Sequence, residues 1–223
     1  MLDWSEIKTV LLDMDGTILD LHFDNHFWLE HLPLRYAQQQ NISLEDAREE
    51  LTSHYEKVYG TIAWYCLDYW AEQTQLPIND LKREVQHLIS LRDDAHDFLT
   101  ALRNTGREVI LVTNAHPDSL SLKIERTQLD RYFDKLYSTH EFGATKESQV
   151  LWQRLQDKQP FALESTLFVD DNLGILESAQ TFGIKHLLAV ANPDSKKNSR
   201  EITQFPAIED FSTQLASIKA TPV

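Results

Sequence analysis

The sequence contains almost no cysteine. Among its 223 residues Cys66 is the only one, so no disulfide can form within the chain. A reducing cytoplasm is the compartment in which proteins commonly lack disulfides. The first ten residues also lack a basic segment followed by an apolar one, which is the pattern of a secretion signal. We therefore expect a cytoplasmic protein.

Long hydrophobic runs are also missing. No apolar stretch approaches the roughly 20 residues that a membrane-spanning helix requires, and there is no internal repeat or low-complexity segment. Hydrophobic residues make up 42% of the chain and charged residues 25%, the balance of an ordinary globular protein. The length suits one full core with a sizeable insertion better than two large independent domains.

Positive charge is scarce. Lysine and arginine together number 21 against 35 acidic residues, which gives a formal net charge of −14. Such a chain repels nucleic-acid backbones and anionic membranes, so neither is an expected partner. It also repels a phosphorylated small molecule, unless a metal or local cations reverse the field at the site. An acidic surface that only aids solubility would explain the charge equally well.

The hydrophobic pattern predicts an α/β fold. Short apolar runs bounded by polar residues or glycine are typical of buried strands. Helix-like stretches lie between several of them, at residues 95–104 and 173–182. Strands that alternate with helices predict a doubly wound parallel sheet. The predicted strands are residues 9–13, 108–113, 166–170 and 186–190, with a weaker one at 133–137.

Residues 21–91 have a different sequence pattern, because no convincing strand occurs there. Helical patterns predominate, and one begins at Ser43, which forms a helix-start signal with Asp46. We interpret 21–91 as an all-helical cap domain inserted into an α/β core formed by residues 1–20 and 92–223.

The acidic residues occupy informative positions. Asp13 ends the first predicted strand, and Asp15 follows two residues later in the turn. Ligands of an open α/β sheet bind beyond the carboxyl ends of its strands. Two close carboxylates repel unless a cation or a shared proton relieves them, and Mg²⁺ prefers oxygen ligands of this kind. Gly16 lets the chain turn sharply and bring backbone N–H groups near an anion.

The other strand ends add matching groups. Thr113 and Asn114 end the second strand with a hydroxyl and an amide, while Asp170 and Asp171 end the strand at 166–170. Lys146 lies between them, just before a helix-like run. Carboxylates for a metal, donors for phosphate oxygens and one ammonium group therefore converge on one edge, as phosphoryl transfer requires.

In this arrangement the chain resembles the haloacid dehalogenase-like (HAD) hydrolase superfamily. Residues 11–17 look like the first motif of that superfamily and residues 111–114 like the second. Lys146 fits the third motif and residues 169–172 the fourth. The four motifs occur in the family order, and the helical insertion falls where a type-one cap is found. The resemblance implies a Rossmann-like core with Mg²⁺ as cofactor.

The resemblance also implies roles. Asp13 would attack phosphorus and form an aspartyl-phosphate, and Asp15 would act as general acid and then base. Thr113 and Lys146 would bind the phosphoryl oxygens, and Lys146 would also neutralise Asp13. The implied ligands of Mg²⁺ are Asp13, the backbone carbonyl of Asp15, Asp170 and, through water, Asp171. The implied substrate contacts are Gly16, Thr17 and Asn114.

The choice of lysine rests on local sequence. Lys123, Lys135 and Lys158 lie in the same region, but Lys146 follows a turn at residues 143–145 and precedes a helix.

Asp15 discriminates within the superfamily, because haloacid dehalogenases lack this second aspartate and need no protonated alkoxide. Its presence favours phosphate chemistry.

Residues 16–25 and 142–147 look like a bacterial purine 5′-nucleotidase subgroup, whose members act on GMP and IMP. Ten aromatic residues in the predicted cap could supply a stacking face for a purine, although the helical spacing of Trp64, Tyr65, Tyr69 and Trp70 also suits a cap core. A small phosphorylated metabolite, favoured to be a purine mononucleotide, is the expected partner. A sugar-phosphate phosphatase, a β-phosphoglucomutase-like phosphomutase and a phospho-aspartate signalling domain stay as alternatives.

Overall fold

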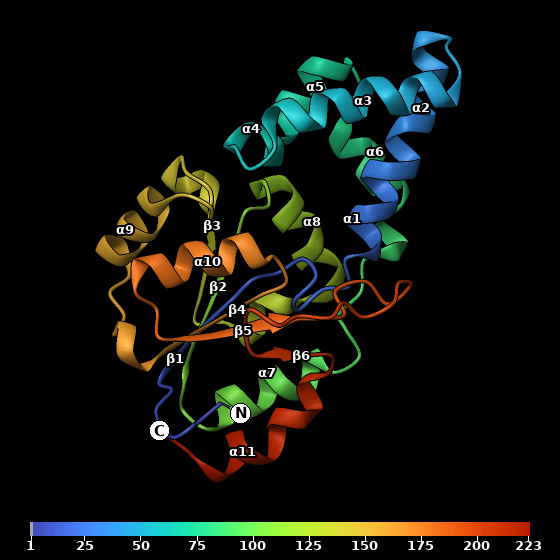
Figure 1. Ribbon diagram of the computed structural model, residues 1–223. Coiled ribbons are helices and arrows are strands. Elements are labelled where there is room, and N and C mark those ends of the chain that lie inside the picture. The colour runs from blue at the N-terminus through green and yellow to red at the C-terminus, as the bar shows by residue number, and fades with distance from the viewer. Residues whose placement is uncertain (1) are drawn as a thin grey trace.

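Figure 1 shows the computed structural model, which describes residues 2–223. A six-stranded sheet in the order β3-β2-β1-β4-β5-β6 forms its centre, and each strand is parallel to its neighbours. The chain winds outward from β1 in both directions, so the expected doubly wound parallel sheet is confirmed. The strands are β1 (Thr9–Leu12), β2 (Glu108–Thr113), β3 (Lys135–Ser138), β4 (Thr166–Asp170), β5 (His186–Val190) and β6 (Ala207–Ile208).

Most predicted strands match these bounds. The strands β2, β4 and β5 begin and end at the predicted residues. The predicted strand at 133–137 is displaced to Lys135–Ser138, because Phe133 closes the preceding 3₁₀ turn through a hydrogen bond to the carbonyl of Asp130. Strand β6 was not predicted, since two residues carry no readable alternation.

Alternate residues of each strand enter two different cores. Val10 and Leu12 pack into the cluster that α7 and α11 complete, whereas Leu11 packs against α9 and α10. Both faces of the sheet are therefore covered, as the apolar strands require. The covering helices are α7 (Ala95–Asn104), α8 (Pro117–Thr127), α9 (Gln149–Lys158), α10 (Leu173–Phe182) and α11 (Leu215–Ala220).

A second group of helices lies apart from the sheet, at the upper right of Figure 1. At the start of α3, the Ser43 hydroxyl accepts a hydrogen bond from the Asp46 N–H at 3.1 Å, which confirms the predicted start signal. Across residues 2–223, no helix combines the length and the apolar character needed to cross a membrane. The helices of this group are α1 (His22–His26), α2 (Leu32–Gln40), α3 (Leu44–Val58), α4 (Ile62–Tyr65), α5 (Leu67–Thr74) and α6 (Ile78–Glu84).

Two crossings of the chain join this helical group to the sheet, and they run side by side. Leu19 and Leu91 form an antiparallel bridge, and the Asp20 N–H donates to the carbonyl of Ser90 at 3.0 Å. Beyond the bridge, the Arg92 side chain donates to the carbonyl of Glu209 at 2.8 Å. The helical group thus leaves and re-enters the sheet layer through one narrow ribbon.

Candidate active site

The carboxyl ends of the central strands bring the predicted residues together. Asp13 follows β1, and its N–H continues the ladder by donating to the Val169 carbonyl at 3.0 Å. Thr113 and Asp170 are the last residues of β2 and β4, the strands on either side of β1. This edge is the point where the order of the sheet reverses, which is the usual place for a ligand in an open α/β sheet.

Lys146 lies against two of these carboxylates. Its ammonium group donates to the carboxylate of Asp13, and to an oxygen of Asp170 at 2.7 Å. All three side chains are buried, so each charge depends on the others for compensation. Of the four lysines considered from the sequence, Lys146 is the one that contacts Asp13.

Asn114 holds the Lys146 segment in place. Its side-chain oxygen accepts hydrogen bonds from the Lys146 N–H at 3.0 Å and the Thr139 hydroxyl at 3.1 Å. Its amide nitrogen donates to Glu147 at 3.1 Å. Every polar atom of the side chain therefore has a protein partner. This arrangement favours a positioning role over the predicted contact with substrate.

Thr113 presents a hydroxyl at the same edge. The side chain is buried, and its oxygen accepts a hydrogen bond from the Ala115 N–H at 3.1 Å. The hydroxyl proton remains available to donate, so Thr113 can contact a phosphoryl oxygen next to Asp13. Thr17, also fully buried, has a hydroxyl oxygen without a hydrogen-bond partner.

Three carboxylates form a cluster that suits a hard cation. One oxygen each from Asp13, Asp170 and Asp171 lie within 4.8 Å of one another. Burial raises the pKa of Asp13 to about 6, with Lys146 opposing the rise and Asp170 adding to it. Burial and the charges of Asp170 and Asp13 also raise the pKa of Asp171 well above its ordinary value. An all-oxygen set of this kind fits Mg²⁺, which relieves the repulsion without protons.

Gly16 is required beside this cluster for two reasons. Its φ angle is +86°, a region that side chains disfavour. A Cβ atom at this position would lie 2.8 Å from the carboxyl carbon of Asp171. The turn after β1 and the turn after β4 therefore pack so closely that only glycine fits between them.

Asp15 is not part of this cluster and contacts a residue that sequence reasoning left without a role. Lys123, on α8, donates to the Asp15 carboxylate at 2.7 Å. Burial raises the pKa of Asp15 to about 7, against the opposing charge of Lys123 and with contributions from Asp24 and Asp13. A carboxyl group that titrates near neutrality can both donate and accept a proton at working pH.

The contact continues into the helical group. Lys123 also donates to Asp24 on α1 at 2.7 Å, and Lys82 on α6 donates to the other oxygen of Asp24 at 3.2 Å. Burial would raise the pKa of Asp24, but the two ammonium groups outweigh it and lower that pKa. Asp15, Lys123, Asp24 and Lys82 thus form a charge chain from the β1 turn to α6. Nothing in the local sequence marks Lys123 or Lys82 as different from surface lysines.

A cavity of about 270 Å³ opens beside Asp15. Its polar lining includes Asp15, Asp24 and Lys82. Aromatic side chains of the helical group form a large part of the remaining wall, and Tyr55 and Trp70 meet edge to face with ring centroids 5.1 Å apart. The aromatic residues of the lining are Trp28, Tyr55, Trp64, Tyr65 and Trp70. Several aromatics predicted to be either cap core or substrate contacts therefore serve as both packing and cavity wall.

The helical group also contacts the loop that carries Lys146. The Tyr65 hydroxyl donates to Glu147 at 2.8 Å, and the Thr145 hydroxyl donates to the carbonyl of Gly60 at 3.0 Å. These contacts join the helical group to the loop between β3 and α9.

Comparison with known proteins agrees with this geometry. A family model described as haloacid dehalogenase-like hydrolase matches residues 7–183. The chain is 42% identical over 215 residues to the GMP/IMP nucleotidase YrfG of Escherichia coli K12, with 96% of this chain and 97% of that protein covered.

Solved structures share the fold at lower identity. A HAD phosphatase from Thermococcus onnurineus superposes with a TM-score of 0.79 at 21% identity, covering 97% of this chain and all of that one. An L-2-haloacid dehalogenase from Xanthobacter autotrophicus superposes with a TM-score of 0.58 at 15% identity, covering 96% and 98%. Since proteins of both names share the fold, the fold alone does not select the reaction.

Proposed function

The chain belongs to the haloacid dehalogenase-like hydrolase family, and on that basis we propose that it is a Mg²⁺-dependent phosphatase that hydrolyses GMP and IMP. The observation that carries this assignment is the 42% identity, over nearly the whole of both chains, to a GMP/IMP nucleotidase. The position of Asp15 beside the cavity supports phosphate chemistry over dehalogenation, since an alkoxide leaving group needs a proton donor.

In the first step, an oxygen of the Asp13 carboxylate attacks phosphorus. The bond between phosphorus and the ester oxygen breaks, and the leaving alkoxide takes the proton of the Asp15 carboxyl group. The products are an aspartyl-phosphate on Asp13 and the free nucleoside. Lys146 and Thr113 supply a positive charge and a hydroxyl donor next to the phosphoryl oxygens, where negative charge is concentrated.

In the second step, the Asp15 carboxylate accepts a proton from a water molecule. The resulting hydroxide attacks phosphorus and breaks the bond to Asp13. Inorganic phosphate leaves, while Asp13 regains its carboxylate and Asp15 its proton. A pKa of about 7 allows Asp15 to act in both directions.

Asp13, Asp170 and Asp171 would hold Mg²⁺ together with the backbone carbonyl of Asp15. When bound, the ion neutralises the carboxylates and offsets the charge of the phosphoryl group. The buried ion pairs of Lys146 with Asp13 and Asp170 would persist beside the ion.

The helical group is proposed to act as a cap, with residues 21–91 moving over a core of residues 1–20 and 92–223. Its ends form the paired ribbon around Leu19 and Leu91, a short connection suited to a hinge. The aromatic wall of the cavity, in which Trp28, Trp64 and Tyr65 are partly exposed, offers a purine a stacking face. The single cysteine favours a cytoplasmic setting.

The direct test is phosphate release from a panel of monoesters with Mg²⁺ present. The panel contains GMP, IMP, AMP, a pyrimidine nucleotide and glucose 6-phosphate. We expect release from GMP and IMP to exceed release from the others. The Asp13→Asn variant should release no phosphate from any of them, because an amide cannot form the aspartyl-phosphate.

Asp93→Asn serves as the matched control, because it removes an exposed carboxylate of another acidic pair. It should retain wild-type activity. Comparable release by Asp13→Asn and wild type would overturn the proposed nucleophile. A clear preference for glucose 6-phosphate would instead overturn the substrate assignment and leave the chemistry intact.

A further inference from the structure

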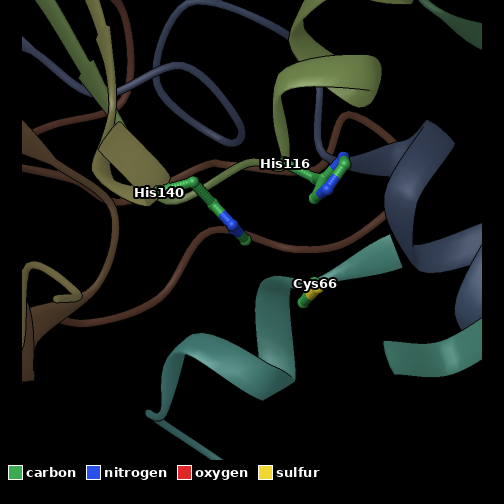
Figure 2. Close-up of side chains that lie close together, drawn as sticks. All are labelled: Cys66, His116 and His140. Atoms are coloured by element: carbon green, nitrogen blue, oxygen red, sulfur yellow. The ribbon is translucent and has the colours of Figure 1, made fainter. Parts of the chain in front are cut away.

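Three side chains with metal-binding atoms face one another outside the carboxylate cluster. They are Cys66, His116 and His140 (Figure 2), and one ligand atom of each lies within 4.8 Å of the others. A thiol and two imidazoles differ in kind from the all-oxygen set at Asp13. Soft nitrogen and sulfur ligands select transition metals rather than Mg²⁺.

The three residues come from different parts of the fold. Cys66 connects α4 to α5 in the helical group, His116 precedes α8 and His140 lies in the 3₁₀ turn Thr139–Phe142 after β3. The histidine rings meet edge to face with centroids 5.0 Å apart. The cluster therefore spans the boundary between the helical group and the sheet.

His140 has an unsatisfied polar atom in this cluster. Its Nε2 is buried and has no hydrogen-bond partner, an arrangement that costs free energy unless a ligand satisfies the atom. Burial also lowers the pKa of His140. A neutral imidazole is the form that binds a metal.

The carboxylate of Asp118 lies near the Nδ1 atom of His116. Its Nδ1 accepts a hydrogen bond of 3.3 Å from the Asp118 N–H, and the Asp118 carboxylate lies 3.9 Å from the same atom. When Nε2 binds a metal, Nδ1 carries the ring proton, so the hydrogen bond from the Asp118 N–H is lost and the Asp118 carboxylate can accept the Nδ1 proton instead. A carboxylate that orients a metal-bound histidine in this way is common in metal sites. Asp68, 3.6 Å from Nε2, lies close enough to add a negative charge.

We propose that Cys66, His116 and His140 form a binding site for a soft divalent transition metal, with Zn²⁺ as the favoured ion. Three protein ligands leave a fourth tetrahedral position for water. On binding, the Cys66 thiol releases its proton to solvent and the thiolate coordinates the ion. The ion would satisfy the buried Nε2 of His140 at the same time.

The metal would tie the helical group to the sheet. A bond from Cys66 to an ion held by His116 and His140 opposes separation of the two layers. On the proposed function, where substrate enters as the helical group moves, this tie lowers turnover. Zn²⁺ is therefore expected to be an inhibitor, bound in part through His116 in the wall of the cavity that Asp15 also lines.

Cobalt provides a test of binding that does not depend on activity. Co²⁺ is added to the full-length protein in an excess of Mg²⁺, and the absorption band from thiolate to Co²⁺ is recorded. Wild type should develop the band to one equivalent, because Cys66 is the only possible thiolate ligand. Competition with Zn²⁺ should abolish it.

Variants locate the site. Cys66→Ser should lose the band, and His140→Asn should lose most of its intensity. His26→Asn is the matched control, because it removes a histidine of the helical group outside the cluster, and should keep the band. Asp13→Asn should also keep it, so a failure of the proposed nucleophile stays distinguishable from a failure of this site.

Inhibition is measured with Zn²⁺ at saturating Mg²⁺, with GMP as substrate. Wild type should lose activity when Zn²⁺ is added. Cys66→Ser should be as active as wild type without Zn²⁺ and should stay active when Zn²⁺ is added. Equal inhibition of the two proteins would overturn the tie between the layers. No thiolate band in folded wild-type protein would overturn the site itself.

Discussion

Gly16 and Asp171 constrain each other across the site. The first occupies a left-handed turn, and the second places its carboxyl group 2.8 Å from where a Cβ of residue 16 would stand. A change as small as one methyl group at residue 16 must therefore displace a carboxylate of the proposed metal cluster.

Gly16→Ala is expected to lower activity about 100-fold, since a displacement of roughly 1 Å at a catalytic group can have that effect. The backbone alone costs about 1–2 kcal/mol at a positive φ. Gly143→Ala separates the two effects, because Gly143 has a φ of +61° but its nearest atom stands 3.8 Å away. Kinetics and urea unfolding of both variants provide the measurement. Similar activity in the two variants would argue against the close contact with Asp171.

Asp15→Asn is expected to reduce turnover of GMP by about 10²–10⁴-fold, the range for loss of general acid–base catalysis. With p-nitrophenyl phosphate, whose leaving group needs no proton, the first step should survive while the second stays slow. Rapid mixing should then show a burst of nitrophenolate close to one equivalent of enzyme. Absence of a burst together with wild-type turnover of GMP would contradict the role of Asp15.

Buried ion pairs link the helices α1, α6 and α8. The buried charge chain through Lys123, Asp24 and Lys82 has one member on each of these helices and ends at Asp15. Each charge is compensated by its neighbours, so removal of the central carboxylate leaves the buried Lys82 ammonium group without a partner and Lys123 with Asp15 alone.

Asp24→Asn is therefore expected to lower the free energy of unfolding by about 3–5 kcal/mol, as for a broken buried ion pair. Glu141→Gln, which breaks the exposed pair with Lys158 at 2.8 Å, should change it by less than about 1 kcal/mol. Urea unfolding measures both. A second substitution, Lys82→Met, should recover part of the loss in Asp24→Asn. Equal, small changes in both single variants would show that the charge chain adds little.

Local signals were sufficient where one element determines its own structure. Residues 95–104 and 173–182 form the predicted helices α7 and α10. The spacing of their apolar residues, and the glycines that follow them at 106 and 183, can be recognised within one segment. Lys123 could not be assigned in this way. Its partner Asp15 is 108 positions away, and only the packing of α8 against the β1 turn brings the two together.

The same distinction applies to the whole molecule. Asp13, Thr113 and Asp170 share an edge because parallel strands place their carboxyl ends together, which the predicted topology already implied. The grouping of Cys66 with two histidines depends on how the helical group sits over the sheet. No motif spacing encodes that arrangement, so it could not be predicted from the sequence.

Divalent cations should stabilise the folded molecule as well as activate it. Removal of metal with a chelator is expected to abolish phosphate release, and Mg²⁺ to restore it. At a concentration of about 100 times its dissociation constant, Mg²⁺ should add about 2.7 kcal/mol to the free energy of unfolding. Asp170→Asn should lose most of this increment in thermal unfolding, whereas Asp93→Asn should keep it. Full stabilisation of Asp170→Asn by Mg²⁺ would place the ion elsewhere.

The paired crossings at Leu19 and Leu91 make the helical group interchangeable. Its two ends emerge next to each other, so a different helical segment of any length could be joined there without altering the order of the strands. Neither β1 nor β2 depends on it for its pairing, because the two strands are bonded directly to each other. Evolution can thus exchange the proposed substrate-recognition segment while the chemistry proposed for Asp13 is retained.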